Sequence, residues 1–359
     1  MAYTNIDDPS AYFQTATYTG NGGSNRAVVN DGNSNLQPDW VWYKSRSHAT
    51  SNILYDSSRG ADYYLKSNTE AGEGSDANMF ESFDSDGFSL NADSDGNASG
   101  RTYVGWQWKC NAGSTSSNTD GNITSTVQAN TTAGFSIVTW TGDGSTSGKN
   151  VGHGLGAVPK MIISKDRDGT SNLPGWYIYH QAIGNQDHIQ FTTGAKADSP
   201  TWGDTTPTSS VFSVGGEGAY IATNQNNIDY VAYVFADVQG YSKFGSYTGT
   251  GARANAPFVY TGFQPAFVMI KNADSTGSWL MFDNKRTIAN GDMDYLLANT
   301  TGVEENSGLS FTDPIDFLSN GFKVLNYDAW ANGSGTKYIY MAFAENPFVT
   351  STGIPTTAR

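Results

Sequence analysis

Residues 159–165 read Pro-Lys-Met-Ile-Ile-Ser-Lys, and this pattern of a proline, an apolar run and a lysine occurs three times in the chain. The other two copies are Pro-Asp-Trp-Val-Trp-Tyr-Lys at 38–44 and Pro-Ala-Phe-Val-Met-Ile-Lys at 265–271. Short runs rich in β-branched and aromatic residues favour β-strands. A proline is tolerated at the head of a strand because the missing N–H donor then lies at the strand end. Each copy is therefore predicted to form a strand.

Four further landmarks keep the same order around each copy. A short opening strand precedes it, and an aromatic strand, a Phe-centred strand and a closing aromatic strand follow it. The opening landmarks are Tyr18-Thr19-Gly20, Trp140-Thr141-Gly142 and Tyr247-Thr248-Gly249. The closing landmarks lie at 103–108, 230–235 and 338–343. The step from Pro38 to Pro159 is 121 residues and the step from Pro159 to Pro265 is 106, so the order predicts a long internal repeat.

The predicted fold is all-β, with three tandem repeats of a jelly-roll-like β-sandwich module. Repeats of this length are long enough for each to bury its own core. The stretch between the first two copies has almost no apolar residues and is typical of a flexible linker, so the first module is expected to be the most independent. The expected segments are an N-terminal arm at 1–16, β-module 1 at 17–110, a Ser/Thr/Asn/Gly-rich linker at 111–131, β-module 2 at 132–240, β-module 3 at 241–346 and a C-terminal tail at 347–359.

The composition of the 359-residue chain narrows the classes of function. Asp and Glu outnumber Lys and Arg by 34 to 20, which gives a net charge of -14. A negative surface repels a phosphate backbone, so we expect no nucleic-acid partner. The single cysteine, Cys110, excludes an intrachain disulfide and a cysteine-rich zinc site. No apolar run reaches the ~20 residues of a membrane helix, and residues 1–13 do not resemble a signal peptide, so we expect synthesis in the cytoplasm and no membrane insertion.

Aromatic residues on the predicted strands are expected to fill the module cores. The tryptophans in this group are Trp40, Trp42, Trp106, Trp108, Trp176 and Trp279. Trp202 and Trp330 lie nearer to predicted turns. Together with Tyr220 and Tyr327, they are the candidates for exposed aromatic contact residues, because an exposed ring can stack on a carbohydrate.

No motif for a known type of catalysis stands out. The chain lacks a phosphate-binding loop, a dinucleotide fingerprint and a GxSxG elbow. Acidic residues are abundant, but most are flanked by Gly, Ser or Asn, which is typical of solvated turns and not of a glycosidase carboxylate pair. His153 lies in a Gly-rich stretch at 152–156 with no apparent nucleophile, and a turn is the plainer interpretation. We therefore expect no enzymatic activity and no catalytic residues.

The stretch Asp93-Ser94-Asp95-Gly96-Asn97 is the candidate metal site, with Asp93, Asp95 and Asn97 as ligands. Carboxylate and amide oxygens suit Ca²⁺, but the stretch lacks the downstream bidentate Glu of an EF-hand loop. Its counterparts in the other copies begin at Asn224 and Asn332 and carry few carboxylates. A hairpin turn is the alternative interpretation. Apart from this calcium candidate, we expect no cofactor.

Several stretches resemble virion proteins of marine tailed phages, especially cyanophages. They are the opening at 18–46, Phe135-Ser136-Ile137-Val138, the segment VGHGLGAVPKMIISK at 151–165 and the closing ENPFVTSTGIPTTAR at 345–359. The resemblance covers nearly the whole chain. It implies a structural or appendage role on the particle, and it brings no catalytic residues with it.

The expected function is therefore that of a non-enzymatic virion structural protein. A tail-fibre component or adhesin that contacts the host surface is the first choice, because polar, Tyr-rich loops make adaptable contact surfaces. A capsid decoration protein and a self-associating fibre component are the alternatives within this class, and a carbohydrate-binding or glycan-cleaving protein is the alternative outside it. The expected partners are other virion proteins, further copies of the chain and a host surface glycan or protein.

Overall fold

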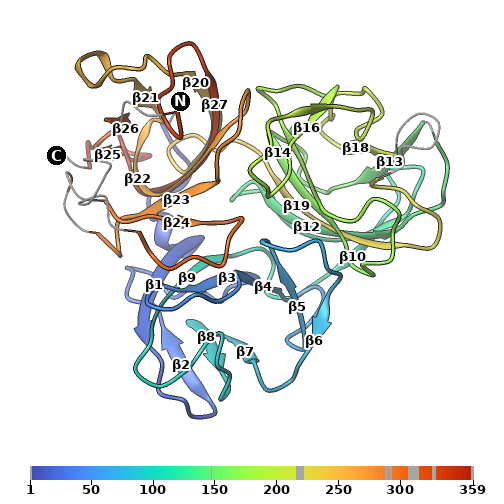
Figure 1. Ribbon diagram of the computed structural model, residues 1–359, viewed down its shortest axis with the longest axis horizontal. Coiled ribbons are helices and arrows are strands. Elements are labelled where there is room, and N and C mark those ends of the chain that lie inside the picture. Colours follow the sequence, from blue (N-terminus) through green and yellow to red (C-terminus); the bar gives the residue numbers. More distant parts are fainter. Residues whose placement is uncertain are drawn as a thin grey trace.

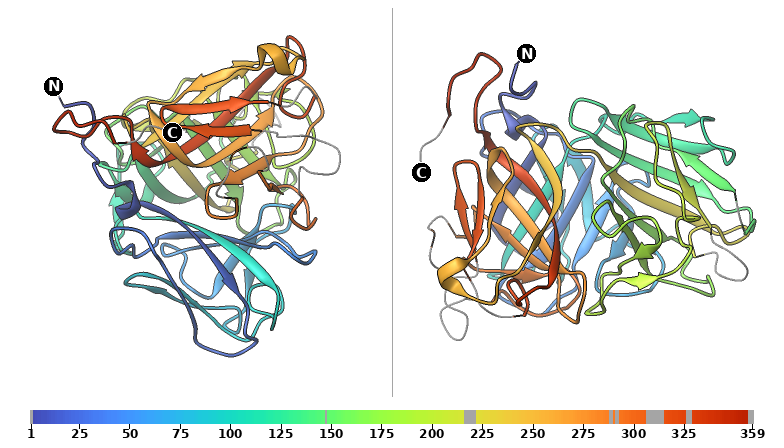
Figure 2. Two further views of the ribbon diagram at one scale, coloured as in Figure 1. Left: turned by 90° about the vertical axis from the view of Figure 1, so that its left-hand side faces the viewer. Right: turned by 90° about the horizontal axis from the view of Figure 1, so that it is seen from above.

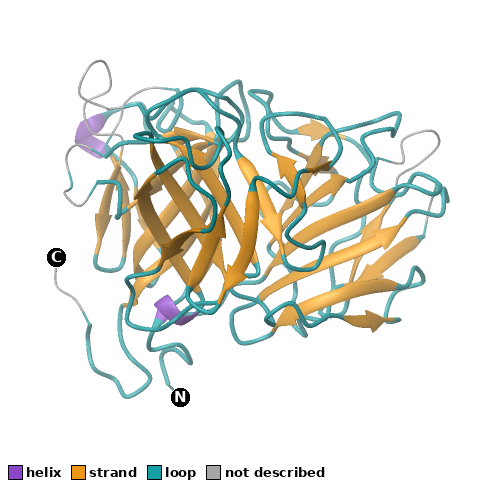
Figure 3. Cartoon of the chain, turned by 90° about the horizontal axis from the view of Figure 1, so that it is seen from below, coloured by secondary structure: helices purple, strands orange, loops and turns teal. Residues whose placement is uncertain are grey.

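The structure is a computed structural model that describes residues 2–146, 148–215, 222–287, 290, 293–305, 315–325 and 329–356. The described chain is all-β: its only helical turns are two short 3₁₀ segments, η1 (Pro9–Ala11) and η2 (Arg253–Asn255) (Figure 3). No helix in these ranges has the length and apolarity needed to cross a membrane. The strands form three lobes that meet at the centre of the molecule (Figure 1).

The first lobe consists of a large sheet and a small sheet. The large sheet has the order β1-β9-β3-β4-β5-β6. Its strands are β1 (Phe13–Thr19), β9 (Thr102–Trp108), β3 (Trp40–Ser45), β4 (Ile53–Asp56), β5 (Tyr63–Lys66) and β6 (Gly74–Ser75). The small sheet has the order β2-β8-β7, with β2 (Arg26–Val29), β8 (Gly87–Leu90) and β7 (Phe80–Asp84).

The second lobe has a large sheet of order β10-β11-β12-β19-β14-β15. Its strands are β10 (Ser116–Asn118), β11 (Ser125–Asn130), β12 (Phe135–Thr141), β19 (Asp229–Phe235), β14 (Met161–Asp166) and β15 (Trp176–His180). Two strand pairs complete the lobe. They are β13 (Lys149–Gly152) with β18 (Val211–Val214) and β16 (Asp187–His188) with β17 (Ala197–Asp198).

The third lobe has a large sheet of order β20-β27-β22-β23-β24 and a small sheet of order β21-β26-β25. The large sheet contains β20 (Ser242–Thr248), β27 (Lys337–Pro347), β22 (Phe263–Asn272), β23 (Leu280–Asp283) and β24 (Leu296–Leu297). The small sheet contains β21 (Phe258–Tyr260), β26 (Gly321–Val324) and β25 (Ile315–Leu318). All strand pairs in the three lobes are antiparallel.

The three Pro-led segments form the strands β3, β14 and β22, as the sequence predicts. In each large sheet this strand pairs with the closing strand, and the closing strand pairs in turn with an opening strand. The third copy differs in one respect, because β22 starts before its proline. Pro265 lies within the strand, where the register shifts against β27, and such an irregularity accommodates a residue without an N–H donor.

The Pro-led strands are apolar at consecutive positions because both faces of each large sheet are buried. All six residues of β3 are buried. Trp40 and Trp42 belong to a core shared by the three lobes, whereas Val41 and Tyr43, which point to the opposite face, belong to the core of the first lobe. The same division separates Met161 and Ile163 from Ile162 in β14, and Phe267 and Met269 from Val268 and Ile270 in β22.

The shared core, here called the central core, is built mainly from aromatic rings of all three lobes. The indole of Trp40 stacks on Tyr233 of the second lobe with ring centroids 4.3 Å apart. Phe343 of the third lobe lies 5.2 Å from Phe13 and 5.6 Å from Trp108, both in the first lobe. The tryptophans expected to pack in separate module cores therefore hold the lobes together.

The stretch at 111–131, predicted to be a flexible linker, instead contains β10 and β11, which extend the large sheet of the second lobe. Its start is fixed to the first lobe by the buried carboxylate of Asp39, which accepts hydrogen bonds from the backbone N–H groups of Cys110, Ala112 and Gly113. The buried Gln128 amide of β11 donates to Ser58 at 2.8 Å. The first lobe is therefore not independent of the second.

The N-terminal and C-terminal segments lie together beside the third lobe (Figure 2). The backbone N–H of Ser351 donates to the Asp7 carboxylate at 2.6 Å. The hydroxyl of Tyr3 donates to the carbonyl of Gly262 at 2.7 Å. The predicted N-terminal arm thus packs on the body of the molecule, and its last residues begin β1.

His180 links the second and third lobes through a fully buried imidazole. Its Nε2 donates to the carbonyl of Tyr340 at 3.2 Å, and its Nδ1 accepts from the N–H of Ala182. This arrangement requires the neutral ring, because a protonated Nδ1 would face another donor. Burial lowers the pKa of His180 to about 4.

We expect the three lobes to unfold in a single transition because they share the central core. Trp40→Ala should lower the free energy of unfolding by about 3–5 kcal/mol through loss of buried ring area and a residual cavity. Val29→Ala, at a position 65% exposed, should change it by less than about 0.5 kcal/mol. Scanning calorimetry tests this, and two separate heat-absorption peaks in the wild-type protein would contradict a shared core.

Acid should destabilise the protein between pH 6.5 and 4. The ordinary histidine pKa of 6.5 applies to the unfolded chain and a pKa of about 4 to folded His180, so the unfolded state binds more protons in this window. The loss from this residue amounts to about 3 kcal/mol at pH 4. His180→Gln should flatten the profile of melting temperature against pH, and His48→Gln, at an exposed site, should keep the wild-type profile. An unchanged profile in His180→Gln would refute the assignment.

Candidate functional site

The residues predicted to bind calcium hold a loop together. The Asp93 carboxylate accepts from the backbone N–H groups of Asp95 at 2.7 Å and Gly96 at 3.1 Å. The amide of Asn97 is fully buried: its oxygen accepts from Asn21 N–H, and its nitrogen donates to the carbonyl of Gly23 at 2.7 Å. Among the described residues, no three His, Cys, Asp or Glu side chains are grouped closely enough to hold a metal ion. The local contacts favour the hairpin-turn interpretation.

The same contact recurs in the other lobes. Asn224 accepts from the N–H of Asp143 at 3.1 Å, and Asn332 accepts from the N–H of Thr250 at 2.7 Å. Like Asn97, both asparagines are fully buried. Each therefore fixes the turn that follows an opening strand, which explains why asparagine persists at this place when the nearby carboxylates do not.

The predicted contact aromatics do not form one surface. Trp202 is 1% exposed and lies in the core of the second lobe, where it packs edge-on against Tyr179. The prediction that Trp202 is exposed is therefore wrong. Trp330 is partly buried against the core of the third lobe. Tyr220 and Tyr327 lie outside the described residues.

The buried histidines of the second lobe have structural surroundings. His153 accepts from the N–H of Leu155, and burial lowers its pKa. His188 contacts the Ser199 hydroxyl at 2.6 Å, which resembles a base and nucleophile pair. Burial lowers the pKa of His188 to about 4, so it is a weak base at neutral pH. Ser199 is itself buried, and neither residue lines the cavity described next.

One cavity receives residues from all three lobes. This three-lobe pocket has a volume of about 580 Å³. Three loops meet around it: 67–70 of the first lobe, 190–193 of the second and 298–301 of the third. The lining residues are Ser67, Asn68, Thr69, Glu70, Gly175, Trp176, Gln190, Phe191, Thr192, Thr193, Asn299 and Thr300. Hydroxyl and amide side chains form most of its wall, and two aromatic rings add apolar surface.

A buried lysine lies behind each of the three loops. These are the lysines that end the Pro-led pattern, and each ammonium group donates to a backbone carbonyl of another lobe. Lys44 donates to Thr301 O at 3.0 Å, Lys165 to Glu70 O at 3.0 Å, and Lys271 to Thr193 O at 3.3 Å. In every case the carbonyl belongs to a different lobe from the lysine. Burial lowers the pKa of each lysine to about 8, so all three remain mainly charged at neutral pH.

Buried polar side chains also fix the positions of the loops. The indole N–H of Trp279 donates to the carbonyl of Gln190 at 2.8 Å, and that of Trp176 donates to the carbonyl of Lys66 at 3.0 Å. The amide of Asn52 donates to the carbonyl of Thr300 at 2.9 Å. Each of these bonds joins two different lobes, so each of the three pocket loops is fixed by a hydrogen bond from a neighbouring lobe.

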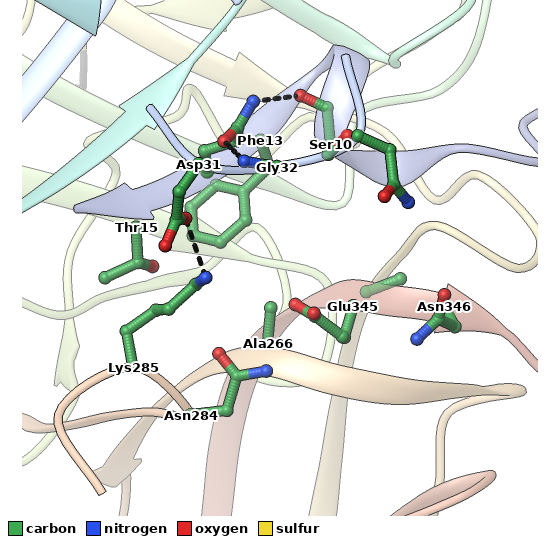
Figure 4. Close-up of a pocket in the computed structure, with 13 residues that line it drawn as sticks. Ser10, Phe13, Thr15, Asp31, Gly32, Ala266, Asn284, Lys285, Glu345 and Asn346 are labelled. Atoms are coloured by element: carbon green, nitrogen blue, oxygen red, sulfur yellow. Dashed lines mark hydrogen bonds and ion pairs between the residues drawn. The ribbon is translucent and has the colours of Figure 1, made fainter. Parts of the chain in front are cut away.

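A second cavity lies at the seam between the first and third lobes (Figure 4). Asp31 and Lys285 face each other across it and form an ion pair at 2.7 Å, and the Gln14 side chain bonds to Gly32 N–H and to Ser10 O. Its volume of about 120 Å³ lies below the ~300 Å³ lower bound of small-molecule sites. It is better suited to ordered water than to a ligand.

The three-lobe pocket is not predicted from the sequence. Its loops are separated by more than 100 residues and contain ordinary Thr, Asn and Gln. The available signal in the sequence is the lysine at the end of the Pro-led pattern. A charged group that follows a buried apolar strand in all three copies needs a hydrogen-bond acceptor in each of them.

Calcium should leave the melting temperature unchanged, because the loop carboxylate and the Asn97 amide already bond to the backbone around them. We expect the same melting temperature in 5 mM CaCl₂ and in 5 mM EDTA. A calcium-dependent rise that disappears in Asp93→Asn would show that the loop binds the ion. Asn97→Ala should destabilise the protein by about 1–3 kcal/mol in either buffer, because buried donors and acceptors lose their partners.

Comparison with known proteins identifies the family of the chain. No curated protein and no solved structure matches the chain. The model of the family described as "Domain of unknown function (DUF7483)" matches residues 8–347, which include every strand of the three lobes. The chain therefore belongs to the DUF7483 family.

Proposed function

We propose that the chain is a non-enzymatic structural protein of a phage particle, built from three tandem β-sandwich modules that close into a ring. The observation that carries the proposal is the cycle of buried lysines. Each lobe supplies one lysine to a loop of a neighbouring lobe, and the third contact returns to the start. A closed cycle around a shared core makes a rigid body whose outer loops are available for contact.

The modules are supported by a contact that recurs with the same geometry. In each lobe an aromatic residue of the opening strand stacks on a tyrosine of the closing strand. All three pairs have centroids 5.1 Å apart and planes inclined by 12°: Tyr18–Tyr103, Trp140–Tyr230 and Tyr247–Tyr338. Together with the shared strand order and the three buried asparagines, this supports an internal repeat.

The closure follows from the direction of the contacts. Lys165 of the second lobe reaches the first lobe, Lys271 of the third reaches the second, and Lys44 of the first reaches the third. Such head-to-tail contacts close into a ring when the rotation between neighbours returns to the start. A pseudo-three-fold arrangement of modules within one chain accounts for this pattern.

The ring is not fully regular. At the contact of the first and second lobes, Glu73 bridges Arg59 and Arg167. At the contact of the third and first lobes, Glu304 bridges Arg286 and Arg46 in the same manner. The contact of the second and third lobes uses the neutral imidazole of His180 instead. Among the described residues, this contact thus has no Arg–Glu–Arg bridge like those of the other two, which makes the three lobes distinguishable.

The surroundings of the ionisable groups support a non-enzymatic role. Buried Arg59 pairs with Asp56 and buried Arg286 with Asp283, so these charges stabilise turns. Of the described residues that line the three-lobe pocket, only Glu70 carries a carboxylate, whereas hydrolysis of a glycoside normally uses two carboxylates. A binding or structural role therefore suits this pocket better than glycan cleavage.

The resemblance to virion proteins of marine tailed phages supports a place on the particle, with an appendage or adhesin role as the first choice. The expected partners remain other virion proteins, further copies of the chain and the host surface. A pseudo-three-fold body is suited to a three-fold position, because it can present similar module surfaces to three equivalent partners.

Immunogold labelling of purified phage particles with an antibody against the chain tests this role. We expect label on the tail or its fibres. We also expect mass spectrometry of gradient-purified particles to detect peptides of the protein. Label on the capsid faces would favour a decoration protein instead. Absence of the chain from purified particles, together with its presence in infected-cell lysate, would refute a virion role altogether.

A further inference from the structure

We infer that the three-lobe pocket binds a neutral saccharide unit. The inference deepens the adhesin role and rests on it for the biological source of the sugar, whereas the binding itself depends only on the pocket. Its volume of about 580 Å³ lies within the ~300–1,000 Å³ of small-molecule sites.

Two polar groups in the pocket wall lack a hydrogen-bond partner within the described residues. The Thr69 hydroxyl oxygen is buried and makes no bond. The structure also gives the side-chain amide of Gln190 no partner there, although its backbone carbonyl accepts from Trp279. The Thr69 oxygen is shielded from solvent, whereas Gln190 is half-buried, so the Gln190 amide is the group that a ligand in the pocket can reach. This amide offers both a donor and an acceptor to a ligand, as a sugar hydroxyl requires.

The remaining wall is fixed before any ligand arrives. The Asn68 oxygen accepts from the N–H of Asn52 at 2.8 Å, and the Asn299 oxygen accepts from the N–H of Trp279 at 2.9 Å. The rings of Trp176 and Phe191 meet edge-on with centroids 5.5 Å apart and give the wall an apolar part. A pre-formed wall reduces the ordering cost of binding.

The charge of the pocket selects among ligand classes. Among the described residues that line it, Glu70 is the one ionisable residue, and none is a lysine or an arginine. The three lysine ammonium groups are already directed at backbone carbonyls behind the loops. A phosphate or carboxylate ligand would therefore meet a carboxylate and no cation. An uncharged ligand with many hydroxyls and an apolar C–H face fits best, and a pyranose ring has both.

Saturation-transfer NMR on the full chain tests the inference with a panel of glucose, galactose, mannose and N-acetylglucosamine, each at 1–5 mM, and with glucuronate as the acidic probe. We expect transfer to at least one neutral sugar and at least a fivefold weaker signal for glucuronate. No transfer to any neutral sugar, or stronger transfer to glucuronate, would overturn the proposal.

Variants locate the binding. Thr192→Trp, on the exposed rim, should fill the pocket and abolish transfer, and Gln190→Ala should weaken binding about tenfold by removing an amide. Thr132→Trp, at an exposed turn outside the pocket, is the matched control and should bind as the wild type does. Melting temperatures verify that each variant is folded. Transfer that persists in folded Thr192→Trp would exclude the pocket. Because the experiment uses isolated protein, its outcome is separate from that of the particle labelling.

Discussion

Each large sheet of this protein has to bury both of its faces, and the rest of the structure depends on that requirement. A sheet exposed on one side alternates apolar and polar residues, whereas a sheet covered on both sides needs continuous apolar strands. The small sheets cover the outer faces. Only the other two large sheets can cover the inner faces, so the lobes converge on the central core and none of them has a complete set of buried contacts alone.

Much of the fold could be predicted from the sequence, because the strands carry a strong local signal. The Pro-led, Phe-centred and closing segments all form the expected strands. The prediction of a linker at 111–131 was wrong because a low content of apolar residues does not exclude burial. Polar side chains can be buried when they form hydrogen bonds inside the protein. Gln128 is fully buried, yet its amide bonds to two serines of the first lobe. The prediction that Trp202 is exposed was wrong for a related reason. The turn residues near it in the sequence give no sign that its ring packs in the core of the second lobe.

The candidate site was much less predictable. The sequence predicts Asp93, Asp95 and Asn97 as calcium ligands because of their oxygen atoms, but a sequence does not say whether an oxygen faces an ion or a backbone N–H. The pocket loops carry no motif at all. Their proximity results from ring closure, which brings Asn68, Thr192 and Thr300 to one cavity although no local pattern connects them. The lysine at the end of the Pro-led pattern is the sequence signal that relates to these loops, because its ammonium group bonds to a loop carbonyl in each lobe.

The meeting of the chain ends beside the third lobe has a consequence for how the polypeptide could be rearranged. The chain passes directly from the first lobe to the second after Cys110, but it does not pass directly from the third lobe to the first. Both contacts nevertheless contain the same kind of Arg–Glu–Arg bridge. Since Asp7 already touches Ser351, a peptide linking the chain at this contact would keep the three lobes together, and new ends could then be opened in a different surface turn. The gene order of the lobes is thus one of three circular permutations compatible with the same set of contacts.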